Sequence, residues 1–292
     1  MKTDSTTRSE KLLRETTAPY LVGDKRAALA EFLTRLEAEH ANDIRRVILY
    51  GSHARGDADA ESDVDLMIVI HGGIDKVREI RRWCADIHTD YVRPIIYAEE
   101  MYEEDQRLKM PLYVNIRRDG VELWNPKAQQ IEELETPLDF IEGEFRMLDY
   151  ETIETIRVYL GYLKEELDEA RILAQADHPG GAVGKLYYAA FDLTTAALYT
   201  VNVVRGKHEG VRSAVNQFLV KPGLLEEEYG KIYDDLMEGR LNVDYRPSKK
   251  IKGEKILSDD ELRQLLRDGE RYIERMKRFL IERGVDESDF NA

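Results

Sequence analysis

Two acidic residues one position apart open an apolar run, and a Gly-Ser pair ends the apolar run before it. The first run covers 47–50 and stops at Gly51 and Ser52, and the second begins around Asp63 and Asp65. Short β-branched and aromatic runs bounded by Gly, Ser and Asp predict strands. Because side chains alternate along a strand, both aspartates are expected on one face, with the intervening valine on the other.

These residue types indicate a metal site beside a phosphate site. Two carboxylates on one edge of a buried strand are costly to hold without a cation, and Mg²⁺ prefers such hard oxygen ligands. Gly51 allows the backbone to approach a ligand closely, and Ser52 offers a hydroxyl and an N–H where a helix is predicted to start. Alone, a Gly-Ser pair is usually a turn and an Asp-x-Asp pair a solvated strand end, so the argument depends on their succession.

The surrounding pattern predicts the elements that position this pair. An amphipathic helix with Asp24 at its N-cap precedes the first strand, and a second helix over 75–88 follows the second strand. Asp90 opens a third strand, in which Pro94 indicates an edge strand or a bulge. The apolar positions expected to face the core in the first helix are Leu29, Phe32, Leu33 and Leu36.

Strand signals nearly vanish after residue 125, and helical periodicity replaces them. We expect a loose N-terminus over 1–22, an α+β domain with a mixed sheet and flanking helices over 23–125, and a linker over 126–143. An all-α helical bundle of five helices is expected over 144–286. A homodimer through a helix face of this bundle is a further expectation, although no residue specifies the face.

Composition limits the classes of function. The 292 residues suffice for two domains, and the net charge of −15 disfavours binding to duplex DNA through bulk charge. One cysteine excludes an intrachain disulfide and a cysteine zinc cluster. No run approaches the ~18 apolar residues of a membrane span, and the N-terminus lacks the apolar segment of a signal peptide. We therefore expect a cytoplasmic protein without membrane contact.

The first constellation resembles a known family. It resembles the signature of minimal nucleotidyltransferases of the DNA polymerase beta superfamily. The matching residues are Gly51-Ser52-His53-Ala54-Arg55-Gly56, followed by Ser62-Asp63-Val64-Asp65-Leu66, and the resemblance covers about residues 25–125. It implies transfer of a nucleoside monophosphate from a nucleoside triphosphate, with ATP expected, to a hydroxyl on a protein, an RNA or a small molecule.

The resemblance also implies roles for single residues. Gly51 and Ser52 would hold the β- and γ-phosphates, with Arg55 and Ser62 as further nucleotide contacts. Asp63 and Asp65 would bind Mg²⁺ or Mn²⁺. A third carboxylate on a neighbouring strand completes such sites, and Asp90 is the candidate here. If Asp90 points away, the domain is expected to bind nucleotide without turnover.

The helical half resembles a HEPN domain over about 145–285. The motifs that support this resemblance are Tyr187-Tyr188-Ala189-Ala190-Phe191, the segment 207–218 and the segment 233–245. Many HEPN toxins are ribonucleases with an Arg-x(4–6)-His motif, but Tyr245 stands where the histidine would follow Arg240, and no histidine occurs after His208. Metal-free RNA cleavage needs a group that exchanges a proton near neutral pH, which tyrosine does poorly.

The bundle residues therefore have alternative interpretations. Arg240 and Tyr245 either bind a phosphate and stack on a base, or Arg240 pairs with Asp244 or Asp235 to hold helices together. His208 is either a structural histidine or part of the same site, and the basic stretch 246–255 is either a solvated loop or an RNA contact. Besides a nucleotidyltransferase, the alternatives are a non-catalytic nucleotide-binding or toxin–antitoxin module and a degenerate HEPN ribonuclease. By analogy alone, Tyr245 is also a candidate target of nucleotidylation by the N-terminal domain of the same chain.

Overall fold

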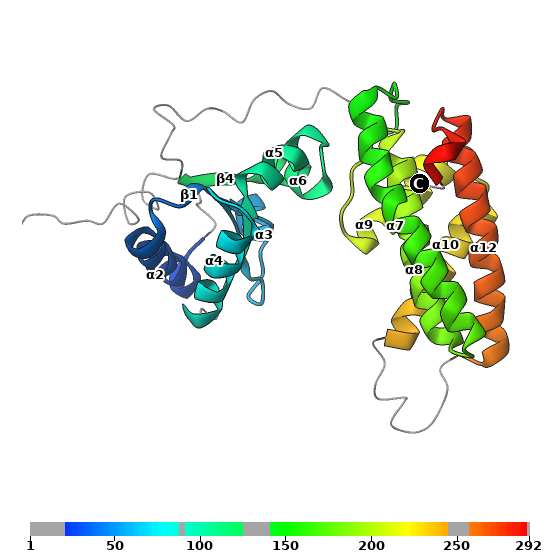
Figure 1. Ribbon diagram of the computed structural model, residues 1–292, viewed down its shortest axis with the longest axis horizontal. Coiled ribbons are helices and arrows are strands. Elements are labelled where there is room, and N and C mark those ends of the chain that lie inside the picture. Colours follow the sequence, from blue (N-terminus) through cyan, green and yellow to red (C-terminus); the bar gives the residue numbers. More distant parts are fainter. Residues whose placement is uncertain (1–20, 88–90, 125–140, 245–256, 291–292) are drawn as a thin grey trace, which may run out of the picture. The chain divides into compact units, whose positions relative to one another are not determined.

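The chain divides into two compact units, residues 1–139 and 140–292. The computed structural model describes residues 21–87, 91–124, 141–244 and 257–290 (Figure 1). The division falls inside the stretch predicted as a linker, most of which lies outside the described residues.

A four-stranded mixed sheet forms the centre of the N-terminal unit. Its strands are β1 (Ile44–Tyr50), β2 (Val64–Ile70), β3 (Val92–Ala98) and β4 (Val121–Trp124), in the spatial order β3-β2-β1-β4. β1 pairs antiparallel with β2 and β4, whereas β2 and β3 are parallel. The strand with Pro94 is an edge strand, as the missing N–H donor of proline predicts.

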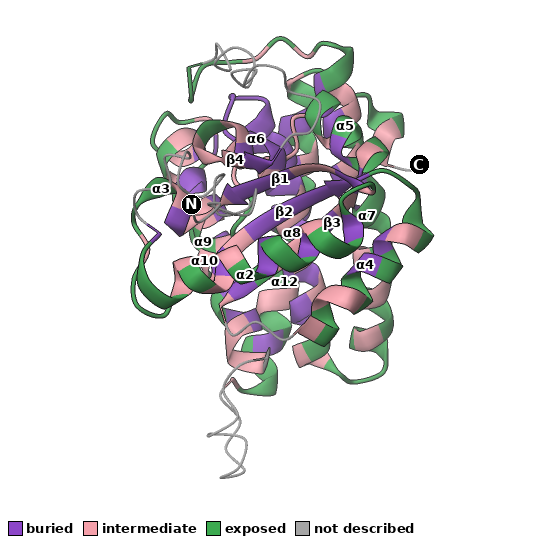
Figure 2. Ribbon diagram, turned by 90° about the vertical axis from the view of Figure 1, so that its left-hand side faces the viewer, coloured by how far each residue is buried: buried purple, intermediate pink, exposed green. Residues whose placement is uncertain are grey.

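Helices cover both faces of this sheet. Helices α2 (Gly23–His40) and α4 (Ile74–Ile87) pack on one face, and α5 (Glu99–Arg107) and α6 (Pro111–Asp119) pack on the other. Figure 2 shows the central strand β2 as almost entirely buried. Alternation along β2 sends Val64, Leu66 and Ile68 toward α2 and α4, and Met67 and Val69 toward α5 and α6.

The helix before the sheet differs from its prediction in one detail. The four apolar residues predicted to face the core are buried. However, Asp24 lies within the first turn, and the N-cap residue is Val22, without a side-chain hydrogen bond to the helix. The apolar face thus decides where α2 packs, and no side-chain cap is needed at its start.

The C-terminal unit is a helical bundle arranged around α8 (Pro179–Tyr199). Around it lie α7 (Tyr150–Gln175), α9 (His208–Ala214) with the π-helical turn η1 (Val215–Val220), α10 (Glu227–Asp244) and α12 (Asp259–Glu282), and the short helix η2 (Glu287–Phe290) follows. α8 packs against α7, α10 and α12 and is buried on nearly every side. α8 begins at Pro179, because proline is well tolerated in a first helical turn.

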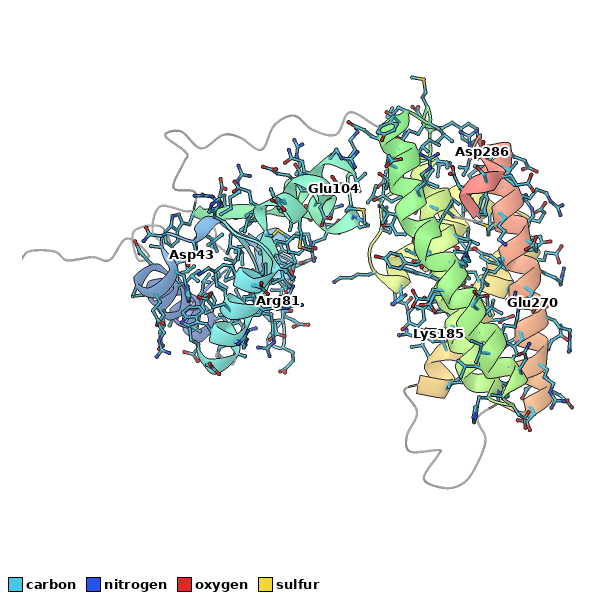
Figure 3. All side chains as sticks on the ribbon, in the orientation of Figure 1. Asp43, Arg81, Glu104, Lys185, Glu270 and Asp286 are labelled. Atoms are coloured by element: carbon cyan, nitrogen blue, oxygen red, sulfur yellow. The ribbon has the colours of Figure 1, made fainter. Side chains whose placement is uncertain are left out.

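Local signals define two other helix starts of the bundle. The carboxylate of Asp149 accepts a hydrogen bond from the Thr152 amide at 2.8 Å and caps α7. Ser258 and Glu261 form a reciprocal capping box at the start of α12. On the bundle surface, Lys185 of α8, labelled in Figure 3, pairs with two glutamates of α7.

Among the described helices, none is long and apolar enough to cross a bilayer.

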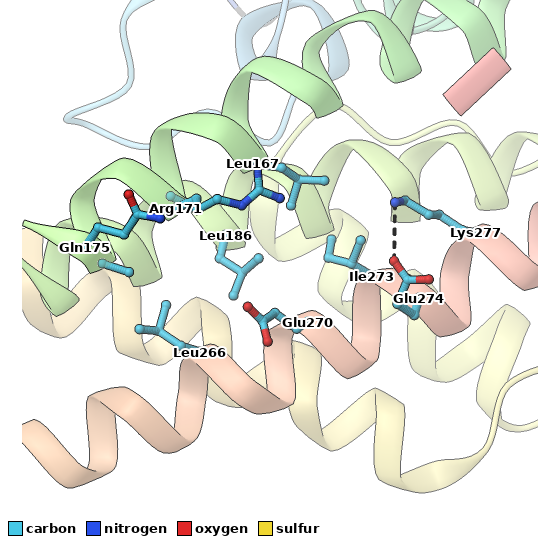
Figure 4. Close-up of a pocket in the computed structure, with 11 residues that line it drawn as sticks. Leu167, Arg171, Gln175, Leu186, Leu266, Glu270, Ile273, Glu274 and Lys277 are labelled. Atoms are coloured by element: carbon cyan, nitrogen blue, oxygen red, sulfur yellow. Dashed lines mark hydrogen bonds and ion pairs between the residues drawn. The ribbon is translucent and has the colours of Figure 1, made fainter. Parts of the chain in front are cut away.

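The bundle carries a surface groove of about 610 Å³ between α7 and α12 (Figure 4). Its lining mixes leucine and isoleucine side chains with charged ones, such as Arg171, Glu270 and the ion pair between Glu274 and Lys277. None of the predicted site residues lines this groove.

Candidate functional site

Gly51 makes the turn between β1 and the short helix α3 (Ser52–Arg55). Its backbone has φ +77° and ψ −155°, a region essentially restricted to glycine. A Cβ placed on Gly51 would overlap the Asp65 carboxylate, with the Asp65 Cγ at 3.2 Å. The absent side chain therefore lets the backbone of the turn lie directly against a carboxylate on the neighbouring strand.

Asp65 belongs to the sheet face that α5 and α6 cover. It pairs in register with Tyr50 of β1, while the preceding Val64 is fully buried on the opposite face. Burial, the Asp65 carboxylate and Tyr97 together raise the pKa of the Tyr50 hydroxyl to about 12. This tyrosine therefore stays neutral beside the carboxylate at physiological pH.

Asp63 lies just before β2, and its carboxylate meets a guanidinium from β3. Arg93 Nε lies 3.3 Å from Asp63 Oδ2, and both side chains are about half exposed. In the parallel pairing of β2 and β3, Arg93 stands directly opposite Asp65. The structure thus gathers Asp63, Asp65 and Arg93 in one charged group next to the Gly51 turn.

Side chains of α2 and α3 hold the loop between α3 and β2. The Lys25 ammonium of α2 donates to the carbonyl oxygens of Asp59, Ala60 and Ser62, at 3.2, 2.8 and 2.6 Å. The buried His53 ring also places Nε2 3.2 Å from the Ser62 carbonyl oxygen. This anchoring fixes the backbone immediately before Asp63.

The other predicted nucleotide contacts take part in local interactions. The Ser62 hydroxyl donates to the Asp59 carboxylate at 2.7 Å, which lowers the pKa of that carboxyl. Arg55 forms a two-point ion pair with Asp57, with both contacts at 3.1 Å. The Ser52 carbonyl accepts the Gly56 amide at 2.8 Å and closes the α3 turn, and the Ser52 side chain is half-buried.

The donor set fits one hard divalent cation. Asp63 and Asp65 offer carboxylate oxygens at the edge of the sheet, and the Gly51 turn leaves backbone close to them. Asp90, the predicted third carboxylate, lies outside the described residues. Within the described ranges no group of three His, Cys, Asp or Glu residues could hold a metal. A bound ion would therefore take its remaining ligands from phosphate oxygens and water, unless a residue outside those ranges contributes.

In the bundle, the structure brings Arg240 and His208 into one aromatic cluster. The Arg240 Nη2 donates to the Tyr188 hydroxyl at 2.7 Å, and the guanidinium lies 5.1 Å from the centre of that ring. The Tyr187 hydroxyl is 2.8 Å from His208 Nδ1, and the His208 ring packs on Phe191 with centroids 4.6 Å apart. Burial, followed by the positive charge of Arg240, lowers the pKa of His208.

This cluster bears on the predicted alternatives for Arg240. Arg240 is 7% exposed, and the contacts of its guanidinium include the rings of Tyr187 and Tyr188 as well as the Tyr188 hydroxyl. The Asp244 side chain and Tyr245 lie outside the described part of the chain. Both the ligand-binding and the helix-holding interpretation of Arg240 remain predictions. Under either interpretation, His208 lies in the same aromatic cluster as Arg240.

Sequence reasoning missed three residues of the N-terminal site, Lys25, Tyr50 and Arg93. Each reaches the site through long-range packing: Lys25 from α2, Tyr50 across the β1–β2 pairing and Arg93 across the β2–β3 pairing. A weak signal existed for Tyr50, because it directly precedes the glycine turn. No local pattern marks the other two residues.

Family models match both halves of the chain. A model described as a nucleotidyltransferase domain matches residues 29–119, and a model described as a HEPN domain matches residues 162–280. The first region contains the Gly51 turn and the Asp63–Asp65 pair, and the second contains the Arg240–His208 cluster.

Three relatives illustrate the similarity. The chain is 29% identical over 136 residues to "Putative toxin MJ0605" of Methanocaldococcus jannaschii. This match covers 47% of this chain and 96% of the relative. It is 29% identical over 96 residues to "Putative protein adenylyltransferase MJ0604" of the same organism, and this match covers 32% of this chain and 91% of the relative. It is 37% identical over 82 residues to a UPF0332 protein of Thermotoga maritima, covering 28% of this chain and 62% of the relative.

Fold, motif order and family models agree for both units. This chain therefore carries a nucleotidyltransferase domain followed by a HEPN domain.

Proposed function

We propose that the N-terminal unit transfers a nucleoside monophosphate from a nucleoside triphosphate, preferably ATP, to a hydroxyl acceptor. The observation that carries the proposal is the Gly51 turn, whose backbone lies against the Asp65 carboxylate while Asp63 stands beside it. The match to a nucleotidyltransferase domain supports the reaction class, and a relative named as a protein adenylyltransferase supports ATP and a protein acceptor.

The residues at the turn bind and orient the triphosphate in this proposal. The backbone at Gly51 and the hydroxyl of Ser52 receive the β- and γ-phosphates, and Ser62 lines the nucleotide side of the loop. Arg55 exchanges its contact with Asp57 for a phosphate oxygen, since a guanidinium binds either group through two parallel hydrogen bonds. Lys25 and His53 keep the loop in place during binding.

The transfer exchanges one phosphorus–oxygen bond for another. The acceptor oxygen forms a bond to the α-phosphorus, the bond from that phosphorus to the α–β bridging oxygen breaks, and pyrophosphate leaves with its electron pair. The acceptor hydroxyl gives its proton to Asp90, the predicted third carboxylate, or to solvent water. Asp63 and Asp65 would hold Mg²⁺, which neutralises charge on the phosphates when bound. The predicted role of Asp90 in completing this site remains part of the proposal.

The test is transfer of an α-phosphate label. The full chain is incubated with Mg²⁺ and each of the four nucleoside triphosphates, alone and with RNA or protein acceptors. Asp63→Asn and Asp65→Asn should each lower label transfer by about 10- to 100-fold or more, because they remove the negative charge of a metal ligand without changing side-chain size. Asp75→Asn is the matched control, since Asp75 is an exposed carboxylate of α4 paired with Arg78.

The outcomes separate catalysis from binding. Unchanged transfer in Asp63→Asn would refute the assignment of the carboxylate pair. Absence of transfer with every acceptor, together with Mg²⁺-dependent nucleotide binding, would instead favour the non-catalytic nucleotide-binding or toxin–antitoxin module. Label on the chain itself would identify self-nucleotidylation, and peptide mapping would then test Tyr245.

A second candidate function concerns the HEPN unit, and one observation favours it. His208, from a different helix, lies in the aromatic cluster of Arg240, although the histidine of the common motif is missing. We propose that this cluster retains metal-independent cleavage of single-stranded RNA, with His208 as the proton-transfer group. Its lowered pKa keeps the imidazole neutral and able to accept a proton.

This second function has its own test. Single-stranded RNA is incubated with the full chain in the presence of EDTA. His208→Ala and Arg240→Ala should abolish cleavage, whereas Arg171→Ala, an exposed position of α7, should not affect it. Cleavage that persists in His208→Ala would refute the role of this histidine, and no cleavage by the native chain would refute the function.

A further inference from the structure

A guanidinium forms part of the carboxylate pair in the N-terminal unit. Arg93 stands opposite Asp65 in the parallel pairing of β2 and β3, and its Nε lies 3.3 Å from Asp63 Oδ2. Its Nη1 also donates to the Val92 carbonyl at 3.4 Å. Side chains opposite each other on neighbouring strands share one sheet face, so Arg93 projects from the same face as Asp65.

The charges of this group have a simple sum. Two carboxylates contribute −2 and the guanidinium +1, so the three side chains together carry −1. Arginine cannot lose its charge at any physiological pH. A permanent positive charge beside Asp63 attracts phosphate oxygens but repels any divalent ion that would bind Asp63 from the Arg93 side.

We propose that Arg93 contacts a phosphate of the bound nucleotide and takes the place of a second metal ion, so that this unit binds its nucleotide with one divalent ion. The inference rests on the proposed nucleotide site and adds the number of ions and a phosphate-binding residue to it. Half of the Arg93 side chain is exposed, so a ligand can reach it. Guanidinium groups bind phosphate with matched, planar geometry.

A role in folding alone predicts a different result. The Arg93–Asp63 pair joins two side chains that are 53% and 43% exposed. Ion pairs of such exposure contribute little to stability because water screens them. Removing the Arg93 charge should therefore leave the unit folded and change its ligand binding.

The experiment titrates Mn²⁺ and an ATP analogue with a methylene group between the α- and β-phosphates, which prevents transfer. Electron paramagnetic resonance counts the Mn²⁺ ions bound per chain at saturating analogue. The native chain should bind one ion. Arg93→Gln and Arg93→Ala should weaken analogue binding by about 10- to 100-fold, the usual effect of losing a hydrogen bond to a charged group.

Two further variants sharpen the result. Arg93→Asp should bind a second Mn²⁺ ion, because it exchanges the repelling charge for a further carboxylate ligand. Arg78→Ala removes an arginine of the same unit that pairs with Asp75 on the α4 surface, and its binding should equal that of the native chain. The tryptophan fluorescence of every variant is compared with that of the native chain to verify folding.

Each outcome has one meaning. Two Mn²⁺ ions bound by the native chain would overturn the inference, as would unchanged analogue affinity in both Arg93→Gln and Arg93→Ala. Label transfer by the native chain together with either result would leave the proposed transferase function standing. Absence of any nucleotide binding or transfer by the native chain would overturn both.

Discussion

Replacing Gly51 by alanine tests the geometry on which the candidate site depends. The substitution adds one methyl group at a residue with φ +77° and ψ −155°. That methyl group would overlap the Asp65 carboxylate, so either the turn or the carboxylate must move. We expect a less stable N-terminal unit and weaker nucleotide binding from the same change.

The magnitude follows from two contributions. Holding alanine in this glycine-only region costs about 1–3 kcal/mol, and pushing the Asp65 side chain off its rotamer costs about 1 kcal/mol more. The expected loss of unfolding free energy is therefore roughly 2–4 kcal/mol. A displaced Asp65 should also lower Mg²⁺-dependent nucleotide affinity by at least about tenfold.

Two other glycines separate these contributions. Gly23 has φ +62° with nothing within 4 Å of an added Cβ, so Gly23→Ala reports backbone strain alone, about 1–2 kcal/mol. Gly73 has neither positive φ nor close neighbours, and Gly73→Ala should change stability by less than about 1 kcal/mol. Neither control should alter nucleotide affinity.

Urea unfolding monitored by tryptophan fluorescence measures these differences. The only two tryptophans of the chain, Trp83 and Trp124, both belong to the N-terminal unit, so the signal reports this unit. If Gly51→Ala unfolded at the same urea concentration as Gly73→Ala and bound nucleotide normally, the proposed contact between the turn and Asp65 would be wrong.

Three further predictions concern single groups. Because the pKa of His208 is lowered in the folded state, the unfolded state binds more protons, so stability should fall as pH drops below about 6.5; circular dichroism melts should lose this dependence in His208→Gln. Burial raises the pKa of the Cys84 thiol to about 12, so a thiol reagent at pH 8 should react slowly until urea is added; rapid labelling of the folded chain would contradict this. A Cβ on Gly269 would overlap Leu186, so Gly269→Ala should destabilise the bundle by about 1–3 kcal/mol in urea melts followed by circular dichroism, whereas Gly161→Ala, with open space around it, should not.

Much of the N-terminal site could be predicted from the sequence because its signals are local. Alternation along one strand correctly separated Val64 from the face that carries Asp65, and the position of Pro94 correctly marked an edge strand. The glycine at the end of β1 indicated a close approach of backbone to a ligand, which stays a prediction, and the structure places Gly51 against the Asp65 carboxylate. Helix periodicity likewise identified most helices of the bundle.

Only the tertiary structure decided which distant residues join these local motifs. The register of β2 against β3 places Arg93 opposite Asp65, and the packing of α2 brings Lys25 to the loop before Asp63. In the bundle, helix packing gathers Arg240 and His208 around one pair of tyrosines. Periodicity along a chain records which side of an element is apolar, but pairing register and helix contacts depend on the simultaneous burial of many distant side chains. The sequence alone therefore predicted the type of chemistry and the two-part organisation, whereas the charge balance of each site is a property of the folded chain.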